Sequence, residues 1–344
     1  MRPADRAAAR SAAQLRRGAP RRIARTARLL ALAALLWVLA PGAAWAQLPD
    51  LVDLSAQYMP GAALEDPRPT RAQVASYEAS ANVPLPLGEK TFLIPGATYH
   101  VEAVSYADAL PGFDQLRAFH SVDVSVLFVQ LLPRDWSLSL RVAPGLAGDF
   151  EGFDGGLARI SALGLVTNTL SEQLVLGGGA LASFSFGTFL PLPAAYVDWT
   201  PTPYLRLEAF LPGFATAKLL FSDRVELGLR VDLAGNAYAV RDARVAGAWP
   251  CAAQPADDPA TEPDERVARP ERCVDHIAYS VATAGVTLGV RAFGTVWLTA
   301  QAGHSLFRRF EPMNADDDGI PGEGQSIPNV LFFRAGATWR IPRS

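Results

Sequence analysis

The sequence contains few lysines, cysteines and histidines, and it lacks long apolar runs. Lys90 and Lys218 are the only lysines, and the chain has 2 Cys and 4 His. Beyond the N-terminal region no run of 18 apolar residues occurs, which excludes a transmembrane helix there. Capped segments with a 3.6-residue period are also missing, while 28 Gly and 27 Pro interrupt the chain throughout. A chain with 50% hydrophobic residues must therefore place them on something other than helices.

The N-terminus has the three parts of a secretory signal peptide. Nine arginines lie between Arg2 and Arg28, an apolar run covers residues 29–40, and the small-residue pattern Ala44-Trp45-Ala46 follows. The apolar run is too short to cross a bilayer, which takes about 20 residues. We expect a signal peptide at residues 1–46, cleaved after Ala46, and a mature domain at residues 47–344. An uncleaved anchor is the alternative.

Cleavage would leave an acidic protein. Residues 1–46 hold nine Arg and one Asp, so the totals of 31 basic and 34 acidic residues fall to 22 and 33, a net charge of −11. Nucleic-acid binding needs a basic footprint, so no nucleic-acid partner is expected.

Apolar and polar residues alternate with a period of two along much of the mature chain. In residues 136–142, the apolar set Trp136, Leu138, Leu140 and Val142 alternates with Ser137, Ser139 and Arg141. The same alternation recurs near residues 76–83, 98–103, 121–128, 224–233 and 331–341. Period two is the spacing of a β-strand whose two faces meet different environments. The sequence therefore predicts an all-β fold.

The lengths of the connections favour a transmembrane barrel over a soluble sandwich. Short connections near residues 84–91, 132–135, 169–173, 200–203, 220–224 and 291–294 alternate with mostly longer ones near 58–72, 106–119, 147–157, 187–193, 241–275 and 305–328. Outer-membrane barrels have this layout, with short periplasmic turns and longer outside loops. The tight turn at Pro212-Gly213 is the one exception, because it would have to lie outside.

The tryptophans also fit a membrane barrel. Trp136, Trp199 and Trp339 share the parity of the apolar residues in their strands and lie beside the proposed periplasmic ends. Aromatic girdles mark the interfaces of membrane barrels in this way. Trp297 departs from the rule, since it shares a face with polar residues.

The chain ends in the pattern Arg334-Ala-Gly336-Ala-Thr-Trp339-Arg-Ile341. This pattern resembles the C-terminal assembly signal of outer-membrane barrels, except that three residues follow it. The resemblance assigns the signal to Gly336, Trp339 and Ile341. It implies the barrel assembly machinery, periplasmic chaperones and outer-membrane lipid as partners. In layout, the mature chain also resembles the uncharacterised outer-membrane β-barrel proteins of Gram-negative bacteria that carry a domain of unknown function. That resemblance implies an outer-membrane location and brings no functional residues with it.

We predict a transmembrane antiparallel up-and-down β-barrel of 12–14 strands after a cleaved signal peptide. The alternation gives fourteen strands. Those near residues 193–200, 203–211 and 213–220 are short for a span of about 9–11 residues, so twelve remains an alternative. The even number follows because both chain ends should be periplasmic.

A closed barrel pairs all of its backbone groups and turns its apolar face to lipid. The polar face then lines the lumen. Its candidate members are Glu78, His100, Glu102, Asp123, Arg141, Arg159, Asp198, Arg206, Glu208, Glu226, Arg230 and Arg334. Either these charges pair across a filled lumen or they line a polar channel. Within one strand pattern lies Gly177-Gly178-Gly179, where glycine permits a bend or the close approach of another segment.

Two long outside loops, near residues 241–275 and 305–328, carry candidate sites. Cys251 and Cys273 share the first loop, and two cysteines in one loop of a secreted chain predict a disulfide. In the second loop, Asn314, Asp316 and Asp318 resemble the start of an EF-hand loop, but Gln325 stands where a bidentate Glu is required. The default is a solvated acidic turn with no cofactor, and calcium is the alternative.

The histidines do not form a recognisable catalytic motif. Neither G-x-S-x-G nor H-E-x-x-H occurs. The pairs Asp275-His276 and His304-Ser305 lie at the proposed outer rim. Adjacent strand residues face opposite sides, so His304 cannot act as a base for Ser305. His100 and Glu102 share a face, which fits a structural hydrogen bond. We therefore expect no enzymatic activity.

Two functional hypotheses remain. The first is a passive, porin-like channel or transporter for small solutes or apolar molecules. The second is a structural or surface-interaction barrel with a filled lumen. An open lumen would favour the first, and a lumen blocked by paired Arg and Glu would favour the second.

Overall fold

The computed structural model describes residues 49–64, 70–107, 117–183, 190–242, 274–315, 319 and 325–340. The proposed signal peptide, both cysteines of the predicted disulfide, Asp316, Asp318 and Ile341 lie outside these residues. In the part of the chain that is described, no helix is long and apolar enough to span a membrane.

Strands account for most of the described residues. They are β1 (Val52–Leu64), β2 (Thr70–Asn82), β3 (Leu85–Gly88), β4 (Thr91–Ala107), β5 (Arg117–Leu131), β6 (Trp136–Gly148), β7 (Ala158–Ser171), β8 (Leu174–Ser183), β9 (Leu190–Thr202), β10 (Leu205–Leu211), β11 (Phe214–Leu220), β12 (Val225–Ala239), β13 (His276–Phe293), β14 (Val296–Met313), β15 (Gln325–Ser326) and β16 (Leu331–Trp339). A single turn of 3-10 helix, η3 (Gly155–Leu157), precedes β7.

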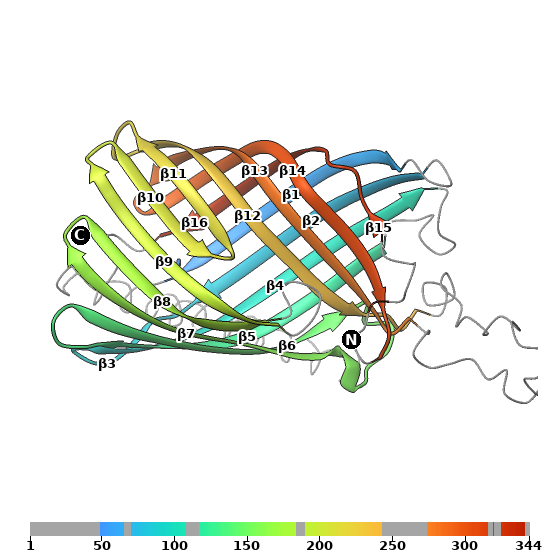
Figure 1. Cartoon of the computed structure of the whole chain (residues 1–344), viewed down its shortest axis with the longest axis horizontal. Helices are drawn as coiled ribbons and strands as arrows, with labels where there is room; N and C mark the ends of the chain where they lie inside the picture. The colour runs from blue at the N-terminus through green and yellow to red at the C-terminus, as the bar shows by residue number, and fades with distance from the viewer. Residues whose placement is uncertain are drawn as a thin grey trace, which may run out of the picture. The chain divides into compact units, whose positions relative to one another are not determined.

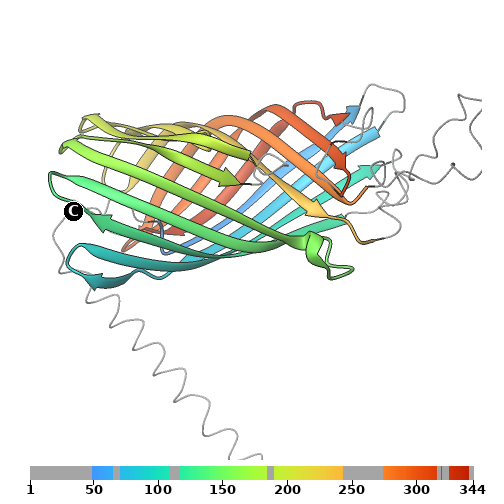
Figure 2. The ribbon, with the colours of Figure 1, turned by 60° about the horizontal axis from the view of Figure 1, so that its bottom comes forward.

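Fourteen of these strands close into one antiparallel barrel. Each strand pairs with its neighbour in the chain from β4 to β14, and β2 pairs with both β1 and β4. The ring closes where β16 pairs with β1 on one side and β14 on the other. The short strands β3 and β15 pair only with β4 and β14. Figures 1 and 2 show the tilted strands from two sides. The predicted fold and the larger of the two strand counts are confirmed.

The described ends and the predicted short turns lie together at one end of the barrel. Val52 pairs with Trp339, and Trp339 pairs with Val296, so the first and last strands begin and end at the same level. The connections at residues 132–135, 172–173, 203–204, 221–224 and 294–295 return the chain at this end. We call it the inner end, and the opposite end the outer end. The turn at Pro212-Gly213 joins β10 to β11, as the sequence predicts.

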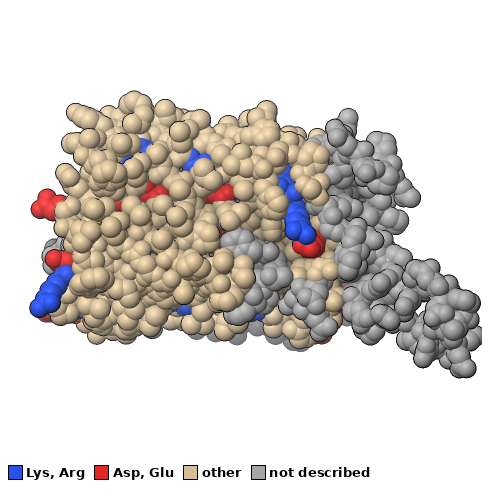
Figure 3. All heavy atoms as spheres, in the orientation of Figure 1, with Lys and Arg blue, Asp and Glu red and all other residues tan. Residues whose placement is uncertain are grey.

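The period-two pattern determines which side chains face outward. Trp136, Trp199 and Trp339 are exposed on the outer surface near the inner end, as expected of a girdle. Trp297 does not follow this rule because its side chain faces the lumen. There the guanidinium of Arg340 lies 4.3 Å from the centroid of the Trp297 ring. Between the two ends, the outer surface seen in Figure 3 carries few charged atoms.

The triple glycine of β8 allows close approach of the neighbouring strand. A Cβ atom added to Gly179 would overlap the backbone carbonyl of Gly164 on β7, and one added to Gly177 would meet the Thr167 methyl group. A Cβ on Gly178 points to the other face and meets nothing nearer than the Ala194 carbonyl oxygen at 4.0 Å. Two of the three glycines are therefore required for β7–β8 pairing.

We expect Gly179→Ala to destabilise the barrel and Gly178→Ala to leave it intact. The new methyl group at residue 179 forces β7 and β8 apart, and overpacking of this kind typically costs about 1–3 kcal/mol. The check is the folded fraction of each refolded variant, read from its heat-dependent mobility on a denaturing gel. Equal folded fractions for the two variants would contradict the close-approach explanation.

Candidate functional site: the barrel lumen

The predicted lumen residues all lie on the inward face of the barrel, and most are paired. His100 Nε2 lies 2.8 Å from Glu102 Oε2, and its Nδ1 lies 3.5 Å from Glu78 Oε2. Ser76 donates a hydrogen bond to the other oxygen of Glu102 at 2.8 Å. The imidazole thus bridges two carboxylates on β2 and β4, which is the structural role expected for it.

A second group of ion pairs lies on β5, β7 and β9–β11. Arg159 donates to Asp123 at 3.1 Å, to Ser121 at 2.9 Å and to Asn236 on β12. Arg206 donates to Asp198 at 2.9 Å. The Lys218 ammonium lies 3.5 Å from Glu208. Arg141 lies on the same inward face of β6, the strand between Asp123 on β5 and Arg159 on β7.

Two further pairs connect strands that are not neighbours. Arg334 on β16 contacts Asp232 on β12 at 3.4 Å and donates to Gln57 at 2.9 Å. Nearer the inner end, Arg340 contacts Glu226 of β12 at 2.9 Å. Arg230 also binds Asp232, at 2.7 Å. The contacts of Arg334 with Asp232 and of Arg340 with Glu226 cross the lumen over β13 and β14. The inner and middle lumen therefore contains a paired charge network.

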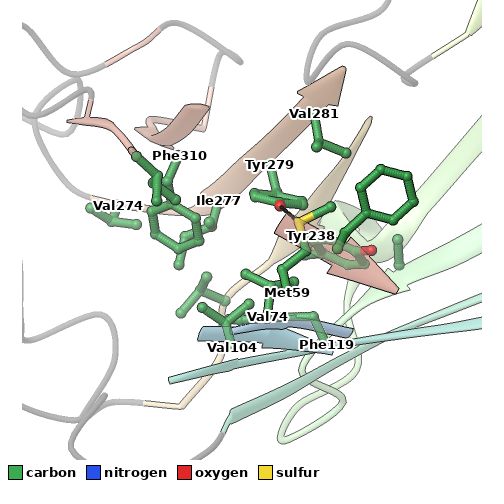
Figure 4. Close-up of a cluster of buried hydrophobic side chains, with 14 residues drawn as sticks. Met59, Val74, Val104, Phe119, Tyr238, Val274, Ile277, Tyr279, Val281 and Phe310 are labelled. Atoms are coloured by element: carbon green, nitrogen blue, oxygen red, sulfur yellow. Dashed lines mark hydrogen bonds between the residues drawn. The ribbon is translucent and has the colours of Figure 1, made fainter. Parts of the chain in front are cut away.

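The outer end of the lumen is instead filled by apolar side chains, which the sequence reasoning missed. The inward-facing residues of this cluster, drawn in Figure 4, are Met59, Val74, Val104, Phe119, Tyr238, Ile277, Tyr279, Val281, Phe310 and Phe332. Ile277 and Phe332 are 0% exposed, and the rings of Phe119 and Tyr238 lie 5.4 Å apart. Tyr279 of β13 donates to the sulfur of Met59 on β1, which also spans the interior. We call this cluster the apolar plug.

A direct contact between β6 and β12 accompanies the plug. Ala239 at the end of β12 pairs with Gly148 at the end of β6, although five other strands separate them around the ring. The amide of Asp149 donates to the Ala239 carbonyl at 3.1 Å, and the Asp149 carboxylate accepts the amides of Arg241 and Asp242 at 2.7 and 2.8 Å. Beyond this level, strands β12–β14, β16, β1, β2 and β4–β6 form a narrower ring around the plug.

Charged residues hold this contact at the rim. Arg241 binds Asp154, ahead of η3, and Asp275, ahead of β13. Arg117 binds Asp242 at 2.9 Å. His276 Nε2 lies 2.9 Å from the Gly156 carbonyl oxygen, and its Nδ1 lies 3.0 Å from Asp275. The pair Asp275-His276 is thereby part of a structural contact between η3 and β12–β13.

The remaining candidate sites are placed as follows. His304 is exposed on the outer surface and contacts the Ser305 carbonyl oxygen at 2.7 Å, whereas Ser305 is buried inside. Asn314 is buried, while its predicted partners Asp316 and Asp318 are not described. The described residues contain no group of three or more His, Cys, Asp or Glu able to hold a metal. The signal residues Gly336 and Trp339 lie on β16, between β1 and β14.

We expect Asp149→Ala to loosen the contact between β6 and β12. Two backbone amides lose a carboxylate acceptor, and leaving such donors unsatisfied typically costs about 1–3 kcal/mol. Hydrogen exchange at residues 237–242 should become faster, while Asp149→Asn, which keeps one acceptor oxygen, should exchange at an intermediate rate. Unchanged protection in Asp149→Ala would show that the plug alone holds β12 in place.

Asp154 should titrate below its ordinary value because of Arg241. The hydrogen bonds from the guanidinium, followed by that from the Gly156 amide, hold the pKa of the Asp154 carboxyl below 3.8. A depressed pKa means that the contact stabilises the rim above pH 3.8 and is lost as the pH falls below that value. Carboxyl-carbon NMR should show a lower midpoint in the wild type than in Arg241→Gln. Equal midpoints would exclude the ion pair.

Comparison with known proteins gives one family match, which covers part of the chain, and several remote structural similarities. A family model described as a domain of unknown function (DUF6268) matches residues 115–246. None of the curated proteins compared with this sequence matches it.

Three solved structures illustrate the likeness. The COG4313 outer membrane channel from Pseudomonas putida F1 has a TM-score of 0.41 and 10% identity, covering 87% of this chain and 99% of that one. LpxR from Salmonella typhimurium gives 0.32 and 8%, covering 84% and 99%. The deltaS2S3 mutant of TodX, described as a monoaromatic hydrocarbon channel, gives 0.36 and 9%, covering 89% and 94%. The chain is thus a closed fourteen-stranded antiparallel β-barrel, and residues 115–246 of it are similar to a domain of unknown function.

Proposed function

We propose that this protein is a passive channel of the Gram-negative outer membrane for small apolar or amphiphilic molecules. The observation that supports this most directly is the division of the lumen. An apolar plug closes the outer end, and a paired charge network occupies the inner and middle part. A water-filled porin keeps its lumen polar from end to end, so this arrangement favours apolar cargo over hydrated solutes.

Apolar inward-facing residues also occur below the plug. On β7–β9 they include Leu163, Leu165, Leu181 and Leu192, which are buried or half-buried. Leucines at these positions do not favour the binding of water or ions, because they offer only apolar surface. An apolar molecule would bury that surface when it binds, and the burial would stabilise the bound state. The proposal is therefore a binding and transfer function.

The proposal places the mature protein in the outer membrane after cleavage at Ala46. Assembly would use the C-terminal signal at Gly336, Trp339 and Ile341, read by the barrel assembly machinery after delivery by periplasmic chaperones. The predicted disulfide between Cys251 and Cys273 would form in the same oxidising compartment.

The second candidate is a structural barrel whose filled lumen carries nothing. It is favoured by the same plug and by the ion pairs that cross the lumen, because both stabilise a closed state. The two functions differ in one measurable property, which is transfer of an apolar probe.

The test uses refolded mature protein in liposomes and planar bilayers. We expect the wild type to show little stepwise conductance and to speed the transfer of N-phenyl-1-naphthylamine into liposomes. Removing the plug with Phe119→Ala and Tyr238→Ala should produce stepwise conductance, because two large buried side chains are lost from the narrow ring. Phe119→Leu, which keeps the apolar filling, is the control and should stay closed. Folded wild-type protein that transfers no probe would overturn the proposal in favour of the structural barrel.

A further inference from the structure

The hairpin formed by β10 and β11 is too short to span the membrane. Each strand has 7 residues. At about 3.3 Å per residue and a tilt of roughly 40°, seven residues rise about 18 Å, against an apolar band of about 25 Å. Figure 1 shows the hairpin ending part-way along its neighbours β9 and β12. The hairpin tip therefore lies within the hydrocarbon. At this position the barrel wall is shorter than the apolar band of the membrane.

Above the tip, two strand edges lack a strand neighbour within the described residues. The last partners on β9 and β12 are Ala195, opposite Leu211, and Asp232, opposite Phe214. Beyond them, residues 190–194 of β9 and 234–238 of β12 have no strand partner on this side within the described residues, and Ala239 pairs with Gly148 of β6. Free strand edges in hydrocarbon expose unpaired backbone groups, each costing several kcal/mol, typically about 2–7. Such an edge persists only if its polar groups are removed or paired locally.

On β9 the donors are removed by proline. Thr200 donates its amide to Gln173, the residue before β8, and amides alternate sides along a strand. Even-numbered amides of β9 therefore point to β8 and odd-numbered amides point to the open side. The odd positions in the free stretch are Pro191 and Pro193, which have no N–H. In β-sheets, proline is found mainly in edge strands and at bulges. Pro191 and Pro193 are therefore typical of an edge strand.

On β12 the edge groups are paired within the protein. Leu233 donates to the Gly213 carbonyl at the hairpin tip, so odd-numbered amides of β12 point to the open side. The Ala237 amide, which is among them, donates to the side-chain oxygen of Asn236 at 3.1 Å. The Ala239 carbonyl accepts the Asp149 amide. The edge of β9 thus lacks two donors, and on β12 the amides of Leu233 and Ala237 have acceptors.

The inner surface beside this interruption is apolar. Leu181 of β8 lies between Leu163 of β7 and Leu192 of β9, and all three face the lumen. At the tip, Phe210 and Phe214 face inward opposite each other, and the Arg230 guanidinium lies 4.7 Å from the Phe214 ring centroid. The charged part of the lumen thus ends at Phe210 and Phe214. From there the inner surface toward the edge of β9 is lined by the three leucines.

The outer surface below the tip is hollowed. A groove of about 790 Å³ crosses the membrane face of β9–β14 and reaches β16. One row of paired residues forms its floor: Val197, Ala209, Ala215, Val231, Ala284, His304 and Leu331. The row passes one residue below Phe210 and Phe214, so the groove begins directly beneath the interruption.

We propose that the interruption between β9 and β12 is a lateral exit, through which small apolar molecules pass between the lumen and the membrane hydrocarbon. The inference rests on the proposed channel function. The plug closes the axial route, so Leu163, Leu181 and Leu192 guide the molecule sideways over the hairpin tip. The groove of small side chains then receives it on the membrane face.

The test blocks the exit after folding. Gly213→Cys places a thiol at the hairpin tip, where a Cβ meets no backbone atom closer than the Phe210 carbonyl oxygen at 3.3 Å. Labelling with N-(1-pyrenyl)maleimide would then add a bulky apolar group at the exit. Ala97→Cys on the membrane face of β4 is the matched control, and labelled wild type accounts for the native cysteines. We expect loss of most N-phenyl-1-naphthylamine transfer in labelled Gly213→Cys and none in labelled Ala97→Cys.

The outcomes separate the two proposals. Transfer that survives labelling of the Gly213→Cys variant would overturn the lateral exit and leave the channel function standing. No transfer by folded wild type would overturn both. A depth measurement is independent of transport: a fluorophore attached to the thiol of Gly213→Cys should be quenched by lipids brominated in the middle of the acyl chain. Quenching only by headgroup-level quenchers would place the tip outside the hydrocarbon and also overturn the exit.

Discussion

Backbone pairing in hydrocarbon is the constraint on which the rest of this structure depends. No water is present to satisfy an N–H or C=O group, so a sheet must close on itself. Closure between β16 and β1 meets that requirement at the inner end. At the outer end the β10–β11 hairpin stops early, and the requirement is met in part by other means. β12 reaches β6, β9 lacks two amide donors at its prolines, and the amides of Leu233 and Ala237 find acceptors nearby.

The same constraint explains why the lumen has two chemically different parts. Where all fourteen strands are present the interior is wide, and charged side chains with long stems can meet across it, as Arg334 and Arg340 do with Asp232 and Glu226. Where the ring narrows at the contact between β6 and β12, the interior is filled by buried aromatic and aliphatic side chains. Packing of this kind stabilises the narrow ring, because the plug residues lose their contact with water.

Much of the fold could be predicted from the sequence because period two is a direct consequence of strand geometry. The strand near residues 136–142, the short turns and the outward tryptophans follow from it, and so does the inward face that carries Glu102 and Arg334. The plug could not be predicted in this way. Phe332 lies between Leu331 and Phe333, so alternation gives no contrast there, and the apolar face of Ile277 and Tyr279 looks like a face turned to lipid. The contact between β6 and β12 depends on Asp149 and Arg241, which lie in loops outside any period.

The prolines of β9 carried a signal that alternation alone does not reveal. Pro191 and Pro193 interrupt an otherwise apolar segment, which first suggests a poor strand. Their spacing of two puts both missing amides on one side, and the pairing of β9 with β8 shows that this is the side without a neighbour. A barrel that only needed to be filled and stable would gain from a longer hairpin, which would pair these edges. Prolines at both positions instead keep this side of β9 without donors, and the edge lies beside inward-facing leucines, which is the arrangement that the proposed lateral exit requires.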